Sequence, residues 1–181
     1  MLSWRWNIMK DILVVIDMQN DFIHGPLKAE GGEEIVPFVV DEIRKRDAFD
    51  VIFTKDTHHD DYLSTNEGRH LPVVHCIENT SGWELVDEIK AVTRDSCIIK
   101  KPTFSSLILI DELRKRVRSK EDIITLVGVC SDICVISNAV LVKAFFRENP
   151  IRVLKDGVKG VTAKKNQEAL DIMESMQIDI L

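Results

Sequence analysis

Short runs of apolar residues, many of them β-branched, recur along the chain and alternate with longer segments of helical periodicity. Each apolar run is bounded by polar or turn-forming residues, which is typical of a buried strand. The predicted strands are 11–16, 51–54, 97–100, 123–129, 151–154 and 178–181. The predicted helices are 33–45, 83–92, 106–118, 132–148 and 163–176. Strands that are apolar on both faces and joined by helices predict a parallel sheet covered on both sides, which is a three-layer α/β/α fold.

The composition is that of an ordinary globular chain, long enough at 181 residues to bury a core without disulfides or a structural metal. We expect one domain over residues 9–181, preceded by an extension at 1–8. The 24 Lys and Arg against 30 Asp and Glu give a net charge of −6, which disfavours nucleic-acid binding. Cysteines are few, and no apolar run reaches the ~20 residues of a membrane span, so we expect a cytoplasmic protein with reduced thiols and no membrane contact.

Three chemically suited side chains follow predicted strands, where ligands of open parallel sheets bind. Cys134 lies in the first turn of a predicted helix, where backbone N–H groups and the helix dipole stabilise a thiolate and can receive an oxyanion. It is the candidate nucleophile, although a buried cysteine that packs the helix on the sheet is an equally good interpretation. Asp17 ends the first strand and needs a cationic partner, which Lys101 or Lys100 supplies, either for catalysis or in a structural ion pair.

Four of the five histidines fall in one long irregular stretch that follows the second strand, and long loops in compact domains are usually functional. Asp56 and His58 lie on the same side of an extended backbone, and His75 can complete a three-ligand site with positions open to water. For His59 and His70 we favour solvated loop side chains. The pattern predicts a divalent metal site.

Five motifs carry a family resemblance. They are Asp17-Met18-Gln19-Asn20-Asp21-Phe22, Lys55-Asp56-Thr57-His58, His75-Cys76, Lys101-Pro102-Thr103-Phe104-Ser105 and Gly128-Val129-Cys130-Ser131-Asp132-Ile133-Cys134-Val135. In this order and spacing they resemble the isochorismatase-like cysteine hydrolases, which include nicotinamidases, N-carbamoylsarcosine amidases and isochorismatases. The similarity runs from about Lys10 to the C-terminus. It implies a Rossmann-like, six-stranded parallel sheet with strand order 3-2-1-4-5-6.

The resemblance also implies roles for the residues at the strand ends. Asp17, Lys101 and Cys134 would form the catalytic triad, which favours Lys101 over its neighbour Lys100. A cis peptide bond would precede Cys130, and the backbone N–H groups of Cys130 and Cys134 would form the oxyanion hole.

The metal-binding branch of the family implies Asp56, His58 and His75 as ligands of a divalent ion, expected to be Zn²⁺ with Fe²⁺ or Mn²⁺ as alternatives. Isochorismatases generally lack this site, which favours the amidases. Some nicotinamidases add a fourth protein ligand, and the candidates are His59, Ser64, Glu67 and His70.

For the substrate, the resemblance implies that Phe22 forms one wall of an aromatic site. Many nicotinamidases place a Trp three residues before the metal histidine, and Pro72 stands there in this chain. Trp83 and Phe104 are the candidates to replace it.

The expected function is therefore a metal-containing cysteine amidohydrolase that cleaves a small carboxamide to acid and ammonia through a thioester, with nicotinamidase first. The alternatives are an N-carbamoylsarcosine amidase-like or isochorismatase-type hydrolase and, from another class, a non-catalytic ligand-binding member of the fold. Because relatives often form dimers or tetramers, we expect a homo-oligomer.

Overall fold

The computed structural model describes residues 9–181, so the predicted extension at 1–8 lies outside the described residues. Six parallel strands form one sheet in the order β3-β2-β1-β4-β5-β6. The strands are β1 (Asp11–Ile16), β2 (Val51–Asp56), β3 (Cys97–Lys101), β4 (Ile123–Val129), β5 (Ile151–Lys159) and β6 (Asp179–Ile180). The predicted sheet and its strand order are confirmed.

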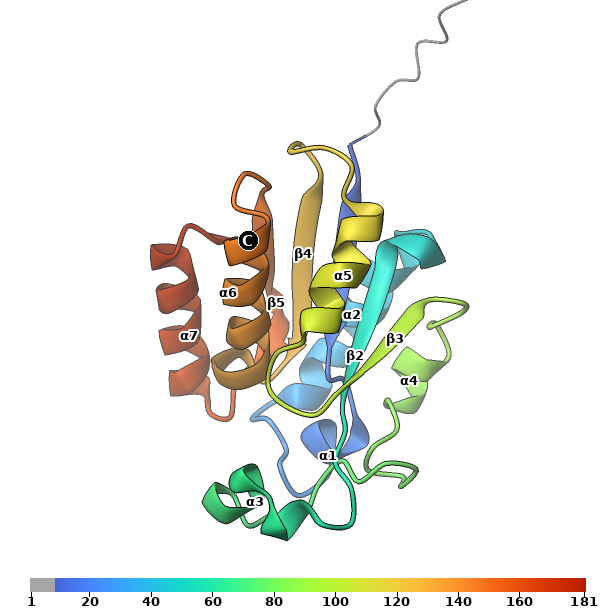
Figure 1. Ribbon diagram of the computed structural model, residues 1–181, viewed down its shortest axis with the longest axis vertical. Coiled ribbons are helices and arrows are strands. Elements are labelled where there is room, and N and C mark those ends of the chain that lie inside the picture. Colours follow the sequence, from blue (N-terminus) through green and yellow to red (C-terminus); the bar gives the residue numbers. More distant parts are fainter. Residues whose placement is uncertain (1–8) are drawn as a thin grey trace, which may run out of the picture.

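Helices cover both faces of this sheet, with α5, α6 and α7 side by side on one face and α2 on the other (Figure 1). The helices are α1 (Asn20–Ile23), α2 (Val36–Arg44), α3 (Asn66–His70), α4 (Asp87–Lys90), α5 (Leu107–Arg116), α6 (Ile136–Phe145) and α7 (Ala163–Ser175). Shorter helical turns are η1 (Gly32–Ile35), η2 (Ala48–Asp50), η3 (Tyr62–Ser64) and η4 (Ser131–Val135). The three-layer prediction is therefore confirmed.

Two hydrophobic clusters lie on opposite sides of the sheet because successive side chains of a strand point to opposite faces. In β1, Leu13 and Val15 pack in the cluster that includes α2 and α4, whereas Ile12, Val14 and Ile16 pack in the cluster that includes α5, α6 and α7. All of these side chains are fully buried. Burial on both faces explains why β1 reads as a continuous apolar run.

The helix predicted at 83–92 is largely wrong, because only Asp87–Lys90 is helical. Leu85 instead forms an antiparallel bridge with Gln19, and the N–H of Val86 donates to the carbonyl oxygen of Met18. Pairing with the segment after β1 thus holds these apolar residues extended. β5 also runs beyond its predicted end, and its register against β4 shifts between Leu126 and Gly128.

β1 and β4 approach closely at Gly128, which is the register partner of Ile16. Gly128 has a φ of +118°, and a Cβ atom there would lie 2.0 Å from the carbonyl oxygen of Ile16. Only glycine fits this position, because any side chain would collide with the neighbouring main chain.

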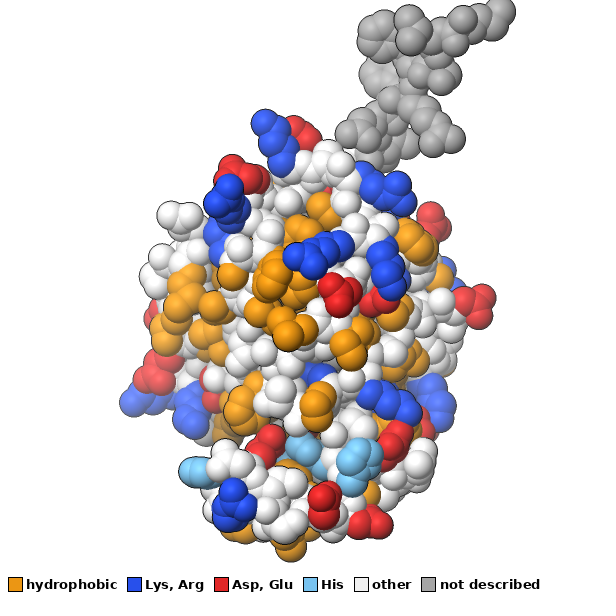
Figure 2. Space-filling model, in the orientation of Figure 1, with side chains coloured by type: hydrophobic (Ala, Val, Ile, Leu, Met, Phe, Trp, Pro, Cys, Tyr) orange, Lys and Arg blue, Asp and Glu red, His pale blue; other side chains and the backbone are white. Residues whose placement is uncertain are grey.

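The outer surface of α5 and α6 carries an apolar patch, visible over these helices in Figure 2. We call the exposed side chains of Leu107, Ile108, Val140 and Phe145 the α5–α6 patch. Within residues 9–181, none of the helices has the length and apolar character needed to span a membrane.

Candidate active site

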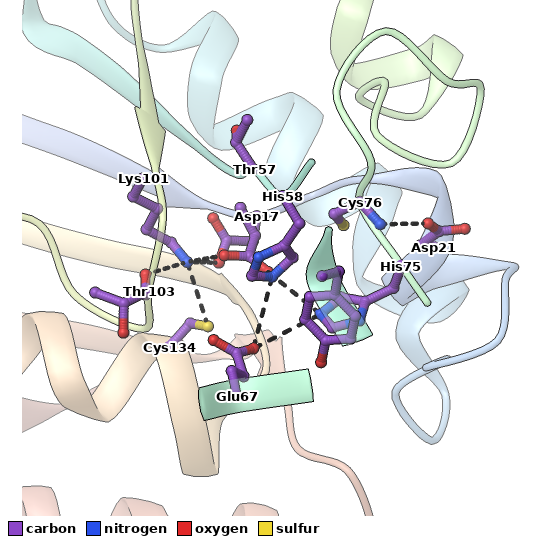
Figure 3. Close-up of polar contacts among 12 residues, drawn as sticks. Asp17, Asp21, Thr57, His58, Glu67, His75, Cys76, Lys101, Thr103 and Cys134 are labelled. Atoms are coloured by element: carbon purple, nitrogen blue, oxygen red, sulfur yellow. Dashed lines mark hydrogen bonds and ion pairs between the residues drawn. The ribbon is translucent and has the colours of Figure 1, made fainter. Parts of the chain in front are cut away.

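Strand register brings an acid and an ammonium together at the carboxyl end of the sheet. Asp56 ends β2, Lys101 ends β3, and the two are register partners, so their side chains share one face. Lys101 Nζ lies 3.3 Å from Asp56 Oδ1 and 2.7 Å from Oδ2 of Asp17, which follows β1 (Figure 3). Thr54 Oγ1 donates a 2.7 Å hydrogen bond to the other oxygen of Asp17.

The choice between Lys100 and Lys101 follows from the alternation of the strand. Lys101 is fully buried among the acidic groups, whereas the Lys100 side chain is 57% exposed and pairs with Glu78 on the other face. Lys101 is therefore the lysine that faces the site, as the resemblance implies.

Cys134 comes to the same point from β4. The peptide bond between Val129 and Cys130 is cis, as the resemblance implies, and the chain then enters η4 and α6. Lys101 Nζ donates to Cys134 Sγ at 3.5 Å, so the sulfur shares the ammonium with Asp17 (Figure 3). The backbone N–H groups of Cys130 and Cys134, the predicted oxyanion donors, belong to this strand-to-helix turn.

Burial dominates the electrostatics of this trio. It raises the pKa of the Asp17 carboxyl, against the opposing effect of Lys101. It also raises the pKa of the Cys134 thiol well above its usual value, again opposed by Lys101. For Lys101, burial alone would lower the pKa, but Asp17, Cys134 and Asp56 outweigh it and the pKa is raised well above 10.5. At rest, Cys134 is thus a neutral thiol and Lys101 an ammonium, and the Asp17 carboxyl binds a proton more readily than an exposed aspartate does.

A second cluster lies next to the trio and contains Asp56, His58, Glu67 and His75. One potential ligand atom from each lies within 4.8 Å of all the others. Asp56 Oδ2 is 3.0 Å from His58 Nε2 and 3.5 Å from His75 Nε2, and Glu67 Oε1 lies 3.6 Å from His58 Nε2 (Figure 3).

The structure singles out Glu67 among the four candidates for a fourth ligand. It projects from α3, a short helix that the sequence did not predict, towards the two imidazoles. His59 is 70% exposed, and His70 and Ser64 bond to backbone carbonyl oxygens of their own loop. Solvated loop histidines were the predicted interpretation of His59 and His70.

The chemistry of this donor set fits a divalent metal. His75 Nδ1 lies 2.8 Å from the carbonyl oxygen of Val73, an arrangement that places the proton on Nδ1 and leaves Nε2 facing the cluster. Two imidazole nitrogens and two carboxylates suit Zn²⁺, Fe²⁺ or Mn²⁺. The residues present therefore support a divalent metal at this position.

A cavity of about 380 Å³ opens beside Cys134 and the metal-ligand cluster. Asp56, Glu67, His75 and Cys134 contribute to its polar end. The rest is mainly apolar, with walls from Phe22, Leu27, Leu71, Phe104, Ile133 and Val161. Phe22 and Phe104, two of the predicted aromatic contacts, thus both line the cavity.

Trp83 is not among the residues that line this cavity. Its Nε1–H donates to Thr57 Oγ1, and Lys55 Nζ lies 3.0 Å from the centroid of its ring. The predicted contact of Trp83 with substrate is corrected accordingly, because the side chain lies on the other face of the strand end and supports the segment that carries Asp56.

Sequence reasoning missed two supporting side chains, Gln19 and Asp21. Gln19 Oε1 accepts the N–H of Asp56 at 2.7 Å, and its Nε2 donates to the carbonyl oxygens of Asp56 and Trp83. Asp21 accepts the backbone N–H of Cys76 at 2.7 Å and so fixes the residue after His75. Both stand in the motif after β1, where polar residues in a buried turn were the available signal.

The family follows from a comparison with protein-family models, in which the isochorismatase domain matches residues 11–181. The chain belongs to the isochorismatase family. One relative is the nicotinamidase of Schizosaccharomyces pombe, which is 28% identical to this chain over 93% of this chain and 91% of that protein.

Solved structures agree with this assignment. The pyrazinamidase of Pyrococcus horikoshii in complex with zinc is 28% identical to this isochorismatase-family chain, with a TM-score of 0.78 over 95% of this chain and 98% of that one. The nicotinamidase/pyrazinamidase of Bacillus subtilis is 25% identical, with a TM-score of 0.79 over 95% and 99% of the two chains.

Proposed function

We propose that the protein is a metal-containing cysteine amidohydrolase that hydrolyses nicotinamide to nicotinate and ammonia. The observation that carries the proposal is the position of Lys101 Nζ, 2.7 Å from Asp17 Oδ2 and 3.5 Å from the sulfur of Cys134, a residue that lines a largely apolar cavity. The nicotinamidase relatives support the choice of substrate, and the metal-like cluster beside the sulfur favours an amidase over a metal-free isochorismatase.

In the first half of the reaction, Asp17 takes the proton of the Cys134 thiol as the sulfur attacks the carboxamide carbon. The raised pKa of Asp17 makes it a better proton acceptor than an exposed aspartate, and Lys101 stabilises the thiolate as it forms. The backbone N–H groups of Cys130 and Cys134 receive the oxyanion. Protonated Asp17 then gives its proton to the departing nitrogen, and ammonia leaves a thioester on the sulfur.

In the second half, Asp17 takes a proton from a water molecule that attacks the thioester carbon. The carbon–sulfur bond breaks, the proton returns to Cys134, and the acid leaves. One amide and one water become one acid and one ammonia, and the protein ends as it began. Lys101 keeps its charge throughout, which agrees with its strongly raised pKa.

Asp56, His58, Glu67 and His75 would hold the metal, for which we propose Zn²⁺, with Fe²⁺ or Mn²⁺ as alternatives. When bound, such an ion supplies a Lewis acid that accepts the lone pair of a ring nitrogen and lowers the pKa of bound water. Phe22 and Phe104 would flank the aromatic ring, since both line the cavity.

The test measures ammonia release from nicotinamide, pyrazinamide, carbamoylsarcosine and a simple aliphatic amide. We expect turnover of nicotinamide that disappears in Cys134→Ala and persists in Cys97→Ala, a control at the start of β3 and so at the opposite end of that strand from Lys101. Nicotinamide turnover that survives in Cys134→Ala removes the sulfur from the reaction. Turnover of carbamoylsarcosine in preference to nicotinamide would transfer the assignment to the other amidase.

For the partner, we propose a second copy of the chain on the α5–α6 patch. Asp111 and Arg114 form an ion pair on α5, and the Arg114 guanidinium lies over the ring of Phe145 in the patch, so a twofold contact can pair these charges between two copies instead. Light scattering tests this: the wild type should have the mass of an oligomer, and Ile108→Glu should have the mass of one chain. A cytoplasmic location remains a prediction, supported by the four free cysteines.

A further inference from the structure

The cavity is larger than the proposed substrate. Nicotinamide has nine non-hydrogen atoms, which fill less than about 270 Å³ even if each is given the ~30 Å³ of a liquid water molecule. The cavity measures about 380 Å³, so about 100 Å³ remains, enough for a substituent of three or four atoms. Cavities from 300 Å³ upwards commonly hold ligands larger than a single ring.

Two lysines, Lys28 and Lys165, line the same cavity. They come from separate segments, the loop after α1 and the first turn of α7, which are tied together by a 2.7 Å hydrogen bond from the N–H of Ala163 to Glu30 Oε2. Both side chains are about half exposed, at 46% and 56%, so they lie at the rim of the cavity. The acidic residues that line it, Asp56 and Glu67, belong to the metal cluster instead.

Neither ammonium group at the rim forms a hydrogen bond with a buried carboxylate. Lys28 Nζ pairs with Glu33 at 2.9 Å, but that carboxylate is itself 48% exposed, and such surface pairs are weak enough for another anion to replace. Asp132 is only 11% exposed, but its Oδ2 lies 3.9 Å from Lys165 Nζ, which is beyond hydrogen-bonding distance, and its Oδ1 accepts the N–H of Val161. The rim therefore offers two positive groups to a ligand that reaches it.

We infer that the outer part of the cavity, at Lys28 and Lys165, is a subsite for an anionic substituent, so that the amides hydrolysed best carry a negative group on the ring remote from the carboxamide. This inference rests on the proposed amidohydrolase function and adds the substrate class to it. The carboxamide meets Cys134 at the polar end, the ring lies between the apolar walls, and the anion takes the remaining space beside the lysines.

The experiment compares two nicotinamides of similar size, 5-carboxynicotinamide and its neutral counterpart 5-acetylnicotinamide, with nicotinamide as reference. Two partly exposed ammonium groups each contribute a factor of a few, so we expect kcat/KM to favour the anionic compound roughly tenfold, mainly through KM. The preference should shrink between 0.1 M and 1 M NaCl, because the screening length falls from about 10 Å to about 3 Å.

The double variant Lys28→Met and Lys165→Met should abolish the preference for 5-carboxynicotinamide over 5-acetylnicotinamide. Lys164→Met is the matched control, because Lys164 is 85% exposed, adjoins Lys165 and does not line the cavity, and it should leave the preference unchanged. Equal kcat/KM for the two compounds, failure to turn over either one, or a preference that survives the double variant overturns the inference. Nicotinamide turnover in the same assay separates these results from failure of the proposed function itself.

Discussion

Replacement of Lys101 by methionine should remove most of the activity while keeping the volume of the side chain. In the structure its Nζ lies 3.5 Å from Cys134 Sγ and makes no contact with solvent. At that distance and an effective dielectric constant of ~20, an ammonium attracts a full thiolate by about 5 kcal/mol. Because each 1.36 kcal/mol corresponds to a factor of ten in rate, we expect kcat/KM for nicotinamide to fall by at least roughly 10³-fold.

The fold should also weaken. Lys101→Met leaves the carboxyl of Asp17 buried without its cation, and loss of one partner of a buried pair typically costs about 3–5 kcal/mol. The cost should fall at or below the lower end of this range, since Asp17 already has a raised pKa and can become neutral. Circular dichroism and urea unfolding establish that the variant is folded before its rate is interpreted.

Lys100→Met is the control, since it removes an adjacent, exposed ammonium that pairs with Glu78 on the other face of the strand. Its ammonia-release rate should match that of the wild type. The reasoning fails if folded Lys101→Met keeps kcat/KM within about tenfold of the wild type, a change of only ~1.4 kcal/mol, or if Lys100→Met loses as much activity.

Three further outcomes test the surroundings of the site. Glu67→Ala should weaken Zn²⁺ binding roughly 10–100-fold in competition with a chromogenic chelator, whereas His59→Ala should not; equal affinities would remove Glu67 from the ligand set. Asp122 accepts three backbone N–H groups that lower its pKa in spite of burial, so Asp122→Asn should cost about 1.5–3 kcal/mol at pH 7. This stabilisation is present above the unfolded pKa of ~3.9 and is lost as pH falls through the folded pKa of Asp122. The difference in unfolding free energy between wild type and Asp122→Asn, measured with urea, should therefore narrow below about pH 4. A difference that stays constant with pH contradicts this reasoning. Trp83→Phe keeps an aromatic ring under Lys55 but loses the hydrogen bond to Thr57, so the free energy of unfolding should fall by about 1 kcal/mol. The KM for nicotinamide should stay unchanged. A raised KM would return Trp83 to the substrate site.

Much of the fold could be predicted from the sequence because strands buried on both faces leave a plain signal. β1 and β4 begin and end where the apolar runs do. The segment at 83–92 misled the prediction because its apolar residues are spaced as in a helix, whereas contacts with the chain after β1 hold Leu85 extended. Such a contact between distant segments overrides the helix propensity of the segment, and the segment's own sequence gives no sign of it.

In the candidate site too, some residues could be placed from the sequence and others could not. Residues that directly follow strands, such as Asp17, could be placed because parallel strands end at one edge of the sheet. Glu67 could not be chosen over its neighbours, because its direction depends on α3, a helix of five residues too short to show a periodic pattern. The position of Trp83 depended on which side of the strand end it occupied, and no spacing in the sequence specifies that.

The contact at Gly128 has a consequence for anyone who wishes to re-engineer this enzyme. Ile16 directly precedes Asp17, and the chain beyond Gly128 leads within a few residues to Cys134, so the gap between acid and sulfur is set by two main chains in contact rather than by side chains. Libraries that vary the cavity walls can therefore reshape substrate choice and leave the reacting groups in place. A single methyl group added at position 128 would act in the opposite way, moving the two strands apart while every reactive side chain is still present.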